Sequence, residues 1–151
     1  MLISACWSLA SKNPLPILSI LSKIDVMDTK EHIRYWKNSS QEDLDAAGSL
    51  LEKKHLRHCM FFAHLTLEKA FKAHVTKTNQ QVPPRIHNLI RLAEMAEIPL
   101  DDKQADFLRE FGIYQLEGRY PDSEQIVLNE SFVKSELDKA KDMFEWLIRQ
   151  L

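Results

Sequence analysis

The feature that most constrains the fold is the run from 56 to 78, which reads LRHCMFFAHLTLEKAFKAHVTKT. On a helix with 3.6 residues per turn, one stripe of this run holds Leu56, Cys59, Met60, Ala63, Leu67, Ala70, Phe71 and His74. The first half is apolar on the opposite side as well, through Phe61, Phe62 and Leu65. A helix that is apolar on every side is buried on every side. We therefore expect this helix at the centre of a bundle, with its second apolar face against another helix or another copy of the chain.

Composition narrows the class of protein. The 151 residues are 44% hydrophobic and 28% charged, values typical of a soluble chain with one core. Three glycines and long stretches rich in Ala, Leu, Glu and Lys favour helices over strands, so we predict an all-α fold. The net charge of −2 lacks the basic excess of a protein that coats duplex nucleic acid, but it leaves room for a local patch that contacts a nucleotide or RNA.

The two cysteines and the first residues bear on location. Cys6 and Cys59 form neither a disulfide framework nor a metal-binding spacing, so we expect a reduced, cytoplasmic setting. We also expect no metal and no cofactor. Residues 1–26 contain the apolar run LPILSIL, which is too short to span a bilayer. Their first basic residue, Lys12, follows the apolar opening, unlike in a signal peptide. We interpret 1–26 as an N-terminal extension that need not belong to the native domain, and 27–151 as the domain proper.

Apolar spacing and turn residues divide the domain into helices. Asp28 and Glu31 have the spacing of a capping box, and apolar positions then recur at steps of three and four, which predicts a first helix over about 29–54. The central helix must end before Pro83 and Pro84.

The second half of the chain predicts three further elements. A short helix is expected over about 87–97, and a longer one from Asp101 or Asp102 to Gly118, with Gly112 as a tolerated interruption. The last helix is marked by a seam of Val133, Leu137, Ala140, Phe144, Leu147 and Leu151. We predict an antiparallel up-and-down bundle of four main helices plus a short inserted helix.

The sequence contains no glycine-rich phosphate loop, HExxH motif or nucleophile elbow, so few residues are candidates for catalysis or ligand binding. Arg57, His64 and Glu68 share a face of the central helix, where His64 is either an acid or base oriented by Glu68 or part of an ordinary helix flank. We expect His74, on the core stripe, to be a hydrogen-bonded structural histidine. At the start of the short helix, Arg85 and His87 suggest either an anion site or a structural bond to a neighbouring element.

A further candidate ligand site is the loop with Arg119, Tyr120 and Asp122. Arginine can fork onto a phosphate and tyrosine can stack on a base, so this loop could hold a nucleotide at the end of the bundle. The structural alternative is a turn whose arginine forms a salt bridge with a neighbouring helix.

Three stretches together carry a family resemblance: EHIRYWKNSSQEDLDAAGSLLEKKHLRHCMFFAHLTLEKAFKAHV, PPRIHNLIRLAE and FLREFGIYQLEGRYPD. Over about 29–151 the chain resembles the HEPN domain family, in its small stand-alone prokaryotic form. The resemblance implies a helical bundle that usually forms a homodimer and is often paired with a minimal nucleotidyltransferase in a toxin–antitoxin module. Many relatives are RNases whose site is an Arg, four to six residues, then His, near the start of the late helix.

The chain departs from that RNase pattern. Arg119 stands near the matching place, but 120–126 contain no histidine. Arg57 and His64 have the required spacing, although in the second helix. We therefore expect a binding or partner module for a nucleotide, an RNA or a nucleotidyltransferase. The alternatives are a metal-independent endoribonuclease that uses Arg57, His64 or His87, and an interaction protein that only dimerises.

Overall fold

The computed structural model describes residues 28–117 and 127–151. Its helices are α2 (Thr29–Glu52), α3 (Leu56–Asn79), α4 (Leu89–Met95), α5 (Asp102–Phe111), α6 (Tyr114–Glu117) and α7 (Glu130–Ile148). These described ranges contain no strand, so the all-α prediction is confirmed. The expected extension, 1–26, and the loop with Arg119, Tyr120 and Asp122 lie outside them.

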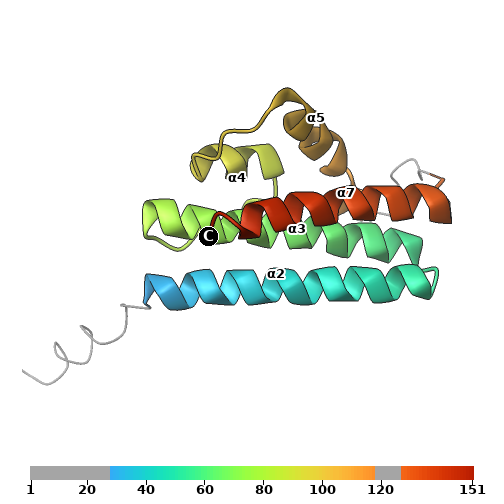
Figure 1. Ribbon diagram of the computed structural model, residues 1–151, viewed down its shortest axis with the longest axis horizontal. Coiled ribbons are helices and arrows are strands. Elements are labelled where there is room, and N and C mark those ends of the chain that lie inside the picture. The colour runs from blue at the N-terminus through green and yellow to red at the C-terminus, as the bar shows by residue number, and fades with distance from the viewer. Residues whose placement is uncertain (1–27, 118–126) are drawn as a thin grey trace, which may run out of the picture.

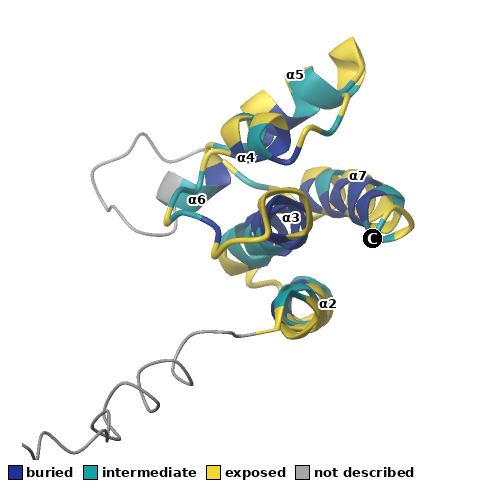
Figure 2. Ribbon diagram, turned by 90° about the vertical axis from the view of Figure 1, so that its left-hand side faces the viewer, coloured by how far each residue is buried: buried dark blue, intermediate teal, exposed yellow. Residues whose placement is uncertain are grey.

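Helix α3 occupies the centre of the bundle, as the sequence predicted (Figure 1). Viewed end-on, it is flanked by α2, by α7 and by the group of α4 and α6 (Figure 2). The chain direction alternates between α2 and α3, while α7 runs parallel to α3 (Figure 1). The predicted stripe is the core, because Cys59, Met60, Ala63, Leu67, Ala70 and Phe71 are fully buried.

The second apolar face of α3 is half-buried at Phe61, Phe62 and Leu65. Phe62 packs against the hydrophobic core, and its ring meets that of Phe61 edge to face at 5.9 Å. Contact of this face with the bundle is thus confirmed for Phe62. Coverage by another copy of the chain stays a prediction.

Local side chains set the helix starts. Asp28 and Asn88 each accept a bond from a backbone N–H of the first turn, and Asp101 forms a full capping box with Gln104. Because Asn88 is the cap, α4 begins at Leu89, two residues later than predicted. It also stops at Met95, two residues before the expected end, and Glu97 then adopts a positive φ of 55°.

The prediction of one helix through Gly112 is wrong, because the chain forms α5 and α6 with a break between them. Glycine weakens a helix interior, and the pattern of backbone hydrogen bonds changes at this point. Gly112 N–H donates to the carbonyl of Leu108, four residues back, whereas Ile113 N–H donates to that of Glu110, three residues back. The break lets Tyr114 bury its side chain with its ring 5.1 Å from that of Phe111. Apolar burial thus accompanies the break between the two helices.

The last helix follows its predicted seam, with Val133, Leu137, Ala140, Phe144 and Leu147 buried. It ends at Ile148, so Leu151, the last residue of the predicted seam, lies beyond the helix. Across residues 28–117 and 127–151, no helix has the length and apolar character needed to cross a membrane.

Candidate functional site

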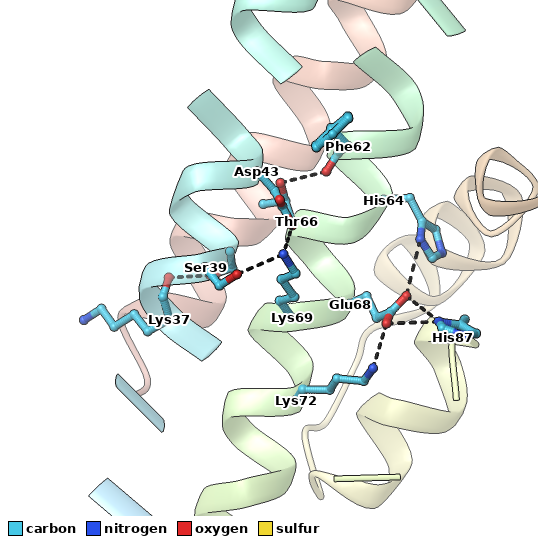
Figure 3. A network of polar contacts seen from close by, with 11 residues as sticks. Lys37, Ser39, Asp43, Phe62, His64, Thr66, Glu68, Lys69, Lys72 and His87 are labelled. Atoms are coloured by element: carbon cyan, nitrogen blue, oxygen red, sulfur yellow. Dashed lines mark hydrogen bonds and ion pairs between the residues drawn. The ribbon is translucent and has the colours of Figure 1, made fainter. Parts of the chain in front are cut away.

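Four polar side chains meet between α3 and the segment that leads into α4, and we call them the Glu68 cluster: His64, Glu68, Lys72 and His87 (Figure 3). Lys72 Nζ lies 2.7 Å from Glu68 Oε1. His87 Nδ1 lies 3.1 Å from Oε1 and 3.0 Å from Oε2 of the same carboxylate. His64 Nδ1 is 3.9 Å from Oε2. One buried carboxylate therefore collects three basic side chains.

The helix places three of these residues. His64, Glu68 and Lys72 are spaced four apart, so they stand on successive turns of one face of α3. His87 arrives from outside the helix: Pro83 and Pro84 follow the end of α3, and the chain then returns to dock His87 on Glu68. The cluster thus ties the α3–α4 connection to the central helix.

Burial separates the inner members of the cluster from the outer one. The side chains of Glu68 and Lys72 are 5% and 9% exposed, whereas that of His87 is 37% exposed. Lys72 Nζ also lies 5.4 Å from the ring centroid of Trp36 on α2, a cation–π contact. Because a buried carboxylate needs a compensating charge and hydrogen bonds, the ion pair with Lys72 and the hydrogen bond from His87 account for its presence in the interior.

The geometry fixes the role of the His87 ring. Its Nδ1–H donates to the carboxylate, which leaves Nε2 as an acceptor when the ring is neutral. A histidine held in one tautomer by a carboxylate, with part of its side chain in water, can bind an anion when protonated or exchange a proton with a ligand. His87 is the member of the cluster that a ligand could reach.

A second polar group joins α3 to α2, and we call it the Asp43 cluster: Ser39, Asp43 and Lys69 (Figure 3). Lys69 Nζ lies 2.6 Å from Asp43 Oδ2 and donates to Ser39 Oγ at 2.9 Å. Burial raises the pKa of the Asp43 carboxyl, and Lys69 opposes that rise through its hydrogen bond and its charge. This cluster joins two helices and has no water-facing histidine.

Two other buried groups have structural roles. His74 Nε2 donates to the Leu147 carbonyl oxygen at 2.9 Å, which confirms the prediction of a hydrogen-bonded core histidine. Burial lowers the pKa of His74, and the bond to Leu147 partly offsets this. Burial also raises the pKa of the Cys59 thiol to about 11, so this cysteine is a poor nucleophile.

The candidate residues from the sequence lie in different environments in the structure. His64 and His87 come together at Glu68, but His64 is completely buried. Arg57 is half-buried about two turns before His64 on α3, and Arg85 is exposed. The loop with Arg119, Tyr120 and Asp122 is outside the described residues. In 28–117 and 127–151, no group of three or more His, Cys, Asp or Glu side chains is arranged to hold a metal ion.

Sequence reasoning missed Lys72 and Trp36 as members of this region. The four-residue step from Glu68 to Lys72 is a recognisable signal for an ion pair on a helix. The contact of Lys72 with Trp36 joins α2 to α3 and has no local sequence signal, because the two residues come from different elements.

Comparison with known proteins gives the class of the chain. The sequence pattern that defines the HEPN domain matches residues 33–151. The chain therefore belongs to the HEPN domain family.

A solved structure supports the same fold. The crystal structure of TT1696 from Thermus thermophilus superposes with a TM-score of 0.67 over 79% of this chain and 98% of that chain, at 20% sequence identity. No protein of curated function matches the chain.

Proposed function

We propose that this protein is a HEPN binding module that recognises a nucleotide or an RNA strand in the cytoplasm, as the partner of a minimal nucleotidyltransferase in a toxin–antitoxin-like pair. The observation that carries this proposal is the position of the last histidine, His87. An RNase site of the usual HEPN type needs a histidine shortly after the arginine of the late segment. Arg119 has no such residue after it, which leaves binding as the function that the sequence retains.

The surroundings of the histidines in the bundle support a binding role. His64 is completely buried, and the ring of His74 is engaged with the Leu147 carbonyl. His87 is partly exposed two residues after the exposed Arg85. We assign Arg85, His87 and Arg119 to contact with ligand phosphates, and Tyr120 and Asp122 to recognition of the rest of the nucleotide, with Tyr120 stacked on the base.

Titration with ATP, GTP and a short single-stranded RNA tests this proposal. We expect saturable binding to at least one of these probes, weakened about tenfold or more by Arg119→Ala or Tyr120→Ala. Arg149→Ala is the matched control, because Arg149 is an exposed arginine after the end of α7 and should leave affinity unchanged. Absence of binding to all three probes contradicts the proposal.

A second candidate function is metal-independent RNA cleavage, and the contact between Glu68 and His87 favours it specifically. A carboxylate that fixes the tautomer of a partly exposed histidine supplies a general base or acid, with Arg85 nearby in sequence as a phosphate ligand. Incubation with total RNA in EDTA distinguishes the candidates. Cleavage that is lost in both His87→Ala and Arg85→Ala would establish the RNase and overturn the binding proposal, whereas intact RNA supports it.

We also propose that the chain forms a homodimer. The half-buried Phe61, Phe62 and Leu65 support self-association, because large apolar side chains on one face are typical of interfaces. Light scattering at micromolar concentration should give twice the monomer mass, and a clean monomer contradicts the proposal. A dimer that binds none of the three probes and cleaves no RNA would instead favour the third alternative, an interaction protein that only dimerises.

A further inference from the structure

A groove of about 590 Å³ separates α5 from α7 on a part of the molecule that shares no residue with the Glu68 cluster. Figure 1 shows α5 standing above α7, with α4 beside it. Its apolar lining is Phe107 from α5 and Met143 and Trp146 from α7. Phe107 and Trp146 are half-buried, so both retain surface that a ligand could cover.

The spacing of the lining residues indicates what kind of ligand the groove can hold. Residues 103–110 on α5 and 139–146 on α7 each span two helical turns, about 10 Å along the axis. Both walls are therefore helices, and each of them contributes to the apolar lining. An amphipathic helix with apolar residues at i, i+3 or i+4, and i+7 matches such a groove.

The charged residues at the rim of the groove indicate which charges the flanks of that helix should carry. Among the polar lining residues, Asp106 is paired with Arg109 and Lys139 with Glu136. Lys103, Glu110 and Asp142 have no ion pair within the described part of the chain. The uncompensated rim thus carries two acids and one base, with an acid on each wall. This balance favours lysine or arginine on the flanks of the ligand.

The walls are anchored independently of any ligand. Leu108 and Phe111 hold α5 in the core, where the rings of Phe107 and Phe111 lie 4.9 Å apart. On the other wall, Met143 is buried and Phe144 and Leu147 fix α7 on the core. The groove is therefore built into the fold, and its occupation does not require either helix to refold.

We propose that the α5–α7 groove is a docking site for an amphipathic helix of a partner protein, with an apolar face flanked by lysine or arginine. The apolar residues of that helix cover Phe107 and Trp146, and its cations face Glu110 and Asp142. This proposal goes beyond the proposed function and does not depend on nucleotide or RNA binding.

Synthetic peptides of about two to four helical turns test the proposal with the full chain. One peptide carries leucines at the stated spacing with lysine flanks, a second has glutamate flanks, and a third is a scramble of the first. In a Trp7→Phe and Trp36→Phe background, Trp146 emission should shift to the blue with the lysine peptide and remain unchanged with the scramble. The lysine peptide should bind about fivefold more tightly than the glutamate peptide.

Charge reversal sharpens the test. The double variant Glu110→Lys and Asp142→Lys should invert the preference between the two peptides. Asp138→Lys is the matched control, because Asp138 is an exposed acid on α7 outside the groove, and it should leave the preference unchanged. Far-ultraviolet circular dichroism of each variant confirms folding before the titration.

Three outcomes overturn the proposal. The first is a Trp146 emission that no peptide changes, and the second is equal binding of both charged peptides. The third is a blue shift of Trp146 with protein concentration alone, in step with dimer formation by light scattering. That result would assign the groove to a second copy of the chain instead of a partner helix.

Discussion

Two lysines three residues apart on α3 each form an ion pair with an acidic side chain. The two pairs differ in the side chains that surround them and in their exposure to solvent. Lys69 pairs with Asp43 of α2, and its side chain is 22% exposed. Lys72 pairs with Glu68 of its own helix, beneath His87 and beside Trp36, and its side chain is 9% exposed. The two nitrogen–oxygen distances are nearly equal, at 2.6 and 2.7 Å.

Similar distances therefore do not imply similar energies. When an acid is removed, the cost depends on whether the remaining ammonium group can regain water. Lys69 is close enough to solvent to extend into it, whereas Lys72 is buried between Glu68 and Trp36. We expect the Glu68 side of α3 to be far more sensitive to substitution than the Asp43 side.

The largest effect should come from Glu68→Ala. This change leaves Lys72 buried without its carboxylate and removes the acceptor of His87, so the free energy of unfolding should fall by about 3–5 kcal/mol. Urea denaturation followed by circular dichroism measures the loss. The double variant Glu68→Leu and Lys72→Leu is the control, because it removes both charges and should recover most of the stability. A loss below about 1 kcal/mol in the single variant would remove the distinction between the two clusters.

A smaller effect is expected for Asp43→Ala, at about 1–2 kcal/mol, because Lys69 keeps its bond to Ser39 and can reach water. The same denaturation experiment measures it. Asp45→Ala, at an exposed acid on α2, should change stability by less than about 0.5 kcal/mol. If Asp43→Ala were as costly as Glu68→Ala, the difference in exposure between the two lysines would not govern the energies.

The outer member of the Glu68 cluster should matter less than the carboxylate itself. His87→Ala removes one hydrogen-bonded partner while Lys72 remains on Glu68, so we expect a loss of about 1 kcal/mol. Amide hydrogen exchange should also accelerate selectively in α4, because His87 ties the start of this helix to α3. His58→Ala provides a control at an exposed histidine of α3. Unchanged exchange in α4 would show that the bond to Glu68 does not hold this segment.

The smallest expected effect is a pH dependence of the free energy of unfolding that comes from Asp43 alone. Because the pKa of Asp43 is raised from 3.8 in the folded state, its contribution to stability is fully present below that value and is lost as pH rises through the folded pKa. The free energy of unfolding of the original chain, minus that of Asp43→Asn, should therefore decrease as pH rises above about 4. Urea titrations at several pH values provide this difference. An increase over the same window would mean that the pairing with Lys69 outweighs burial.

The comparison also shows what a sequence can predict of a site. The four-residue steps from His64 to Glu68 and on to Lys72 are local and visible in the chain. The meeting of Glu68 with His87 is not, because it depends on the direction that the chain takes after Pro83 and Pro84. The burial of these polar side chains likewise could not be predicted, and it separates the enclosed His64 from the accessible His87.

The sequence by itself determined the helices of this protein and its central element, because apolar spacing and capping residues act over a few neighbouring positions. The sequence did not predict that the helix ends at Phe111, just before Gly112, and that Tyr114 beyond the break is buried. Only the tertiary structure decided that Lys72 lies over Trp36 and that α5 and α7 leave a groove. These features depend on how separate helices pack, and packing is a property of the assembled core rather than of any one segment.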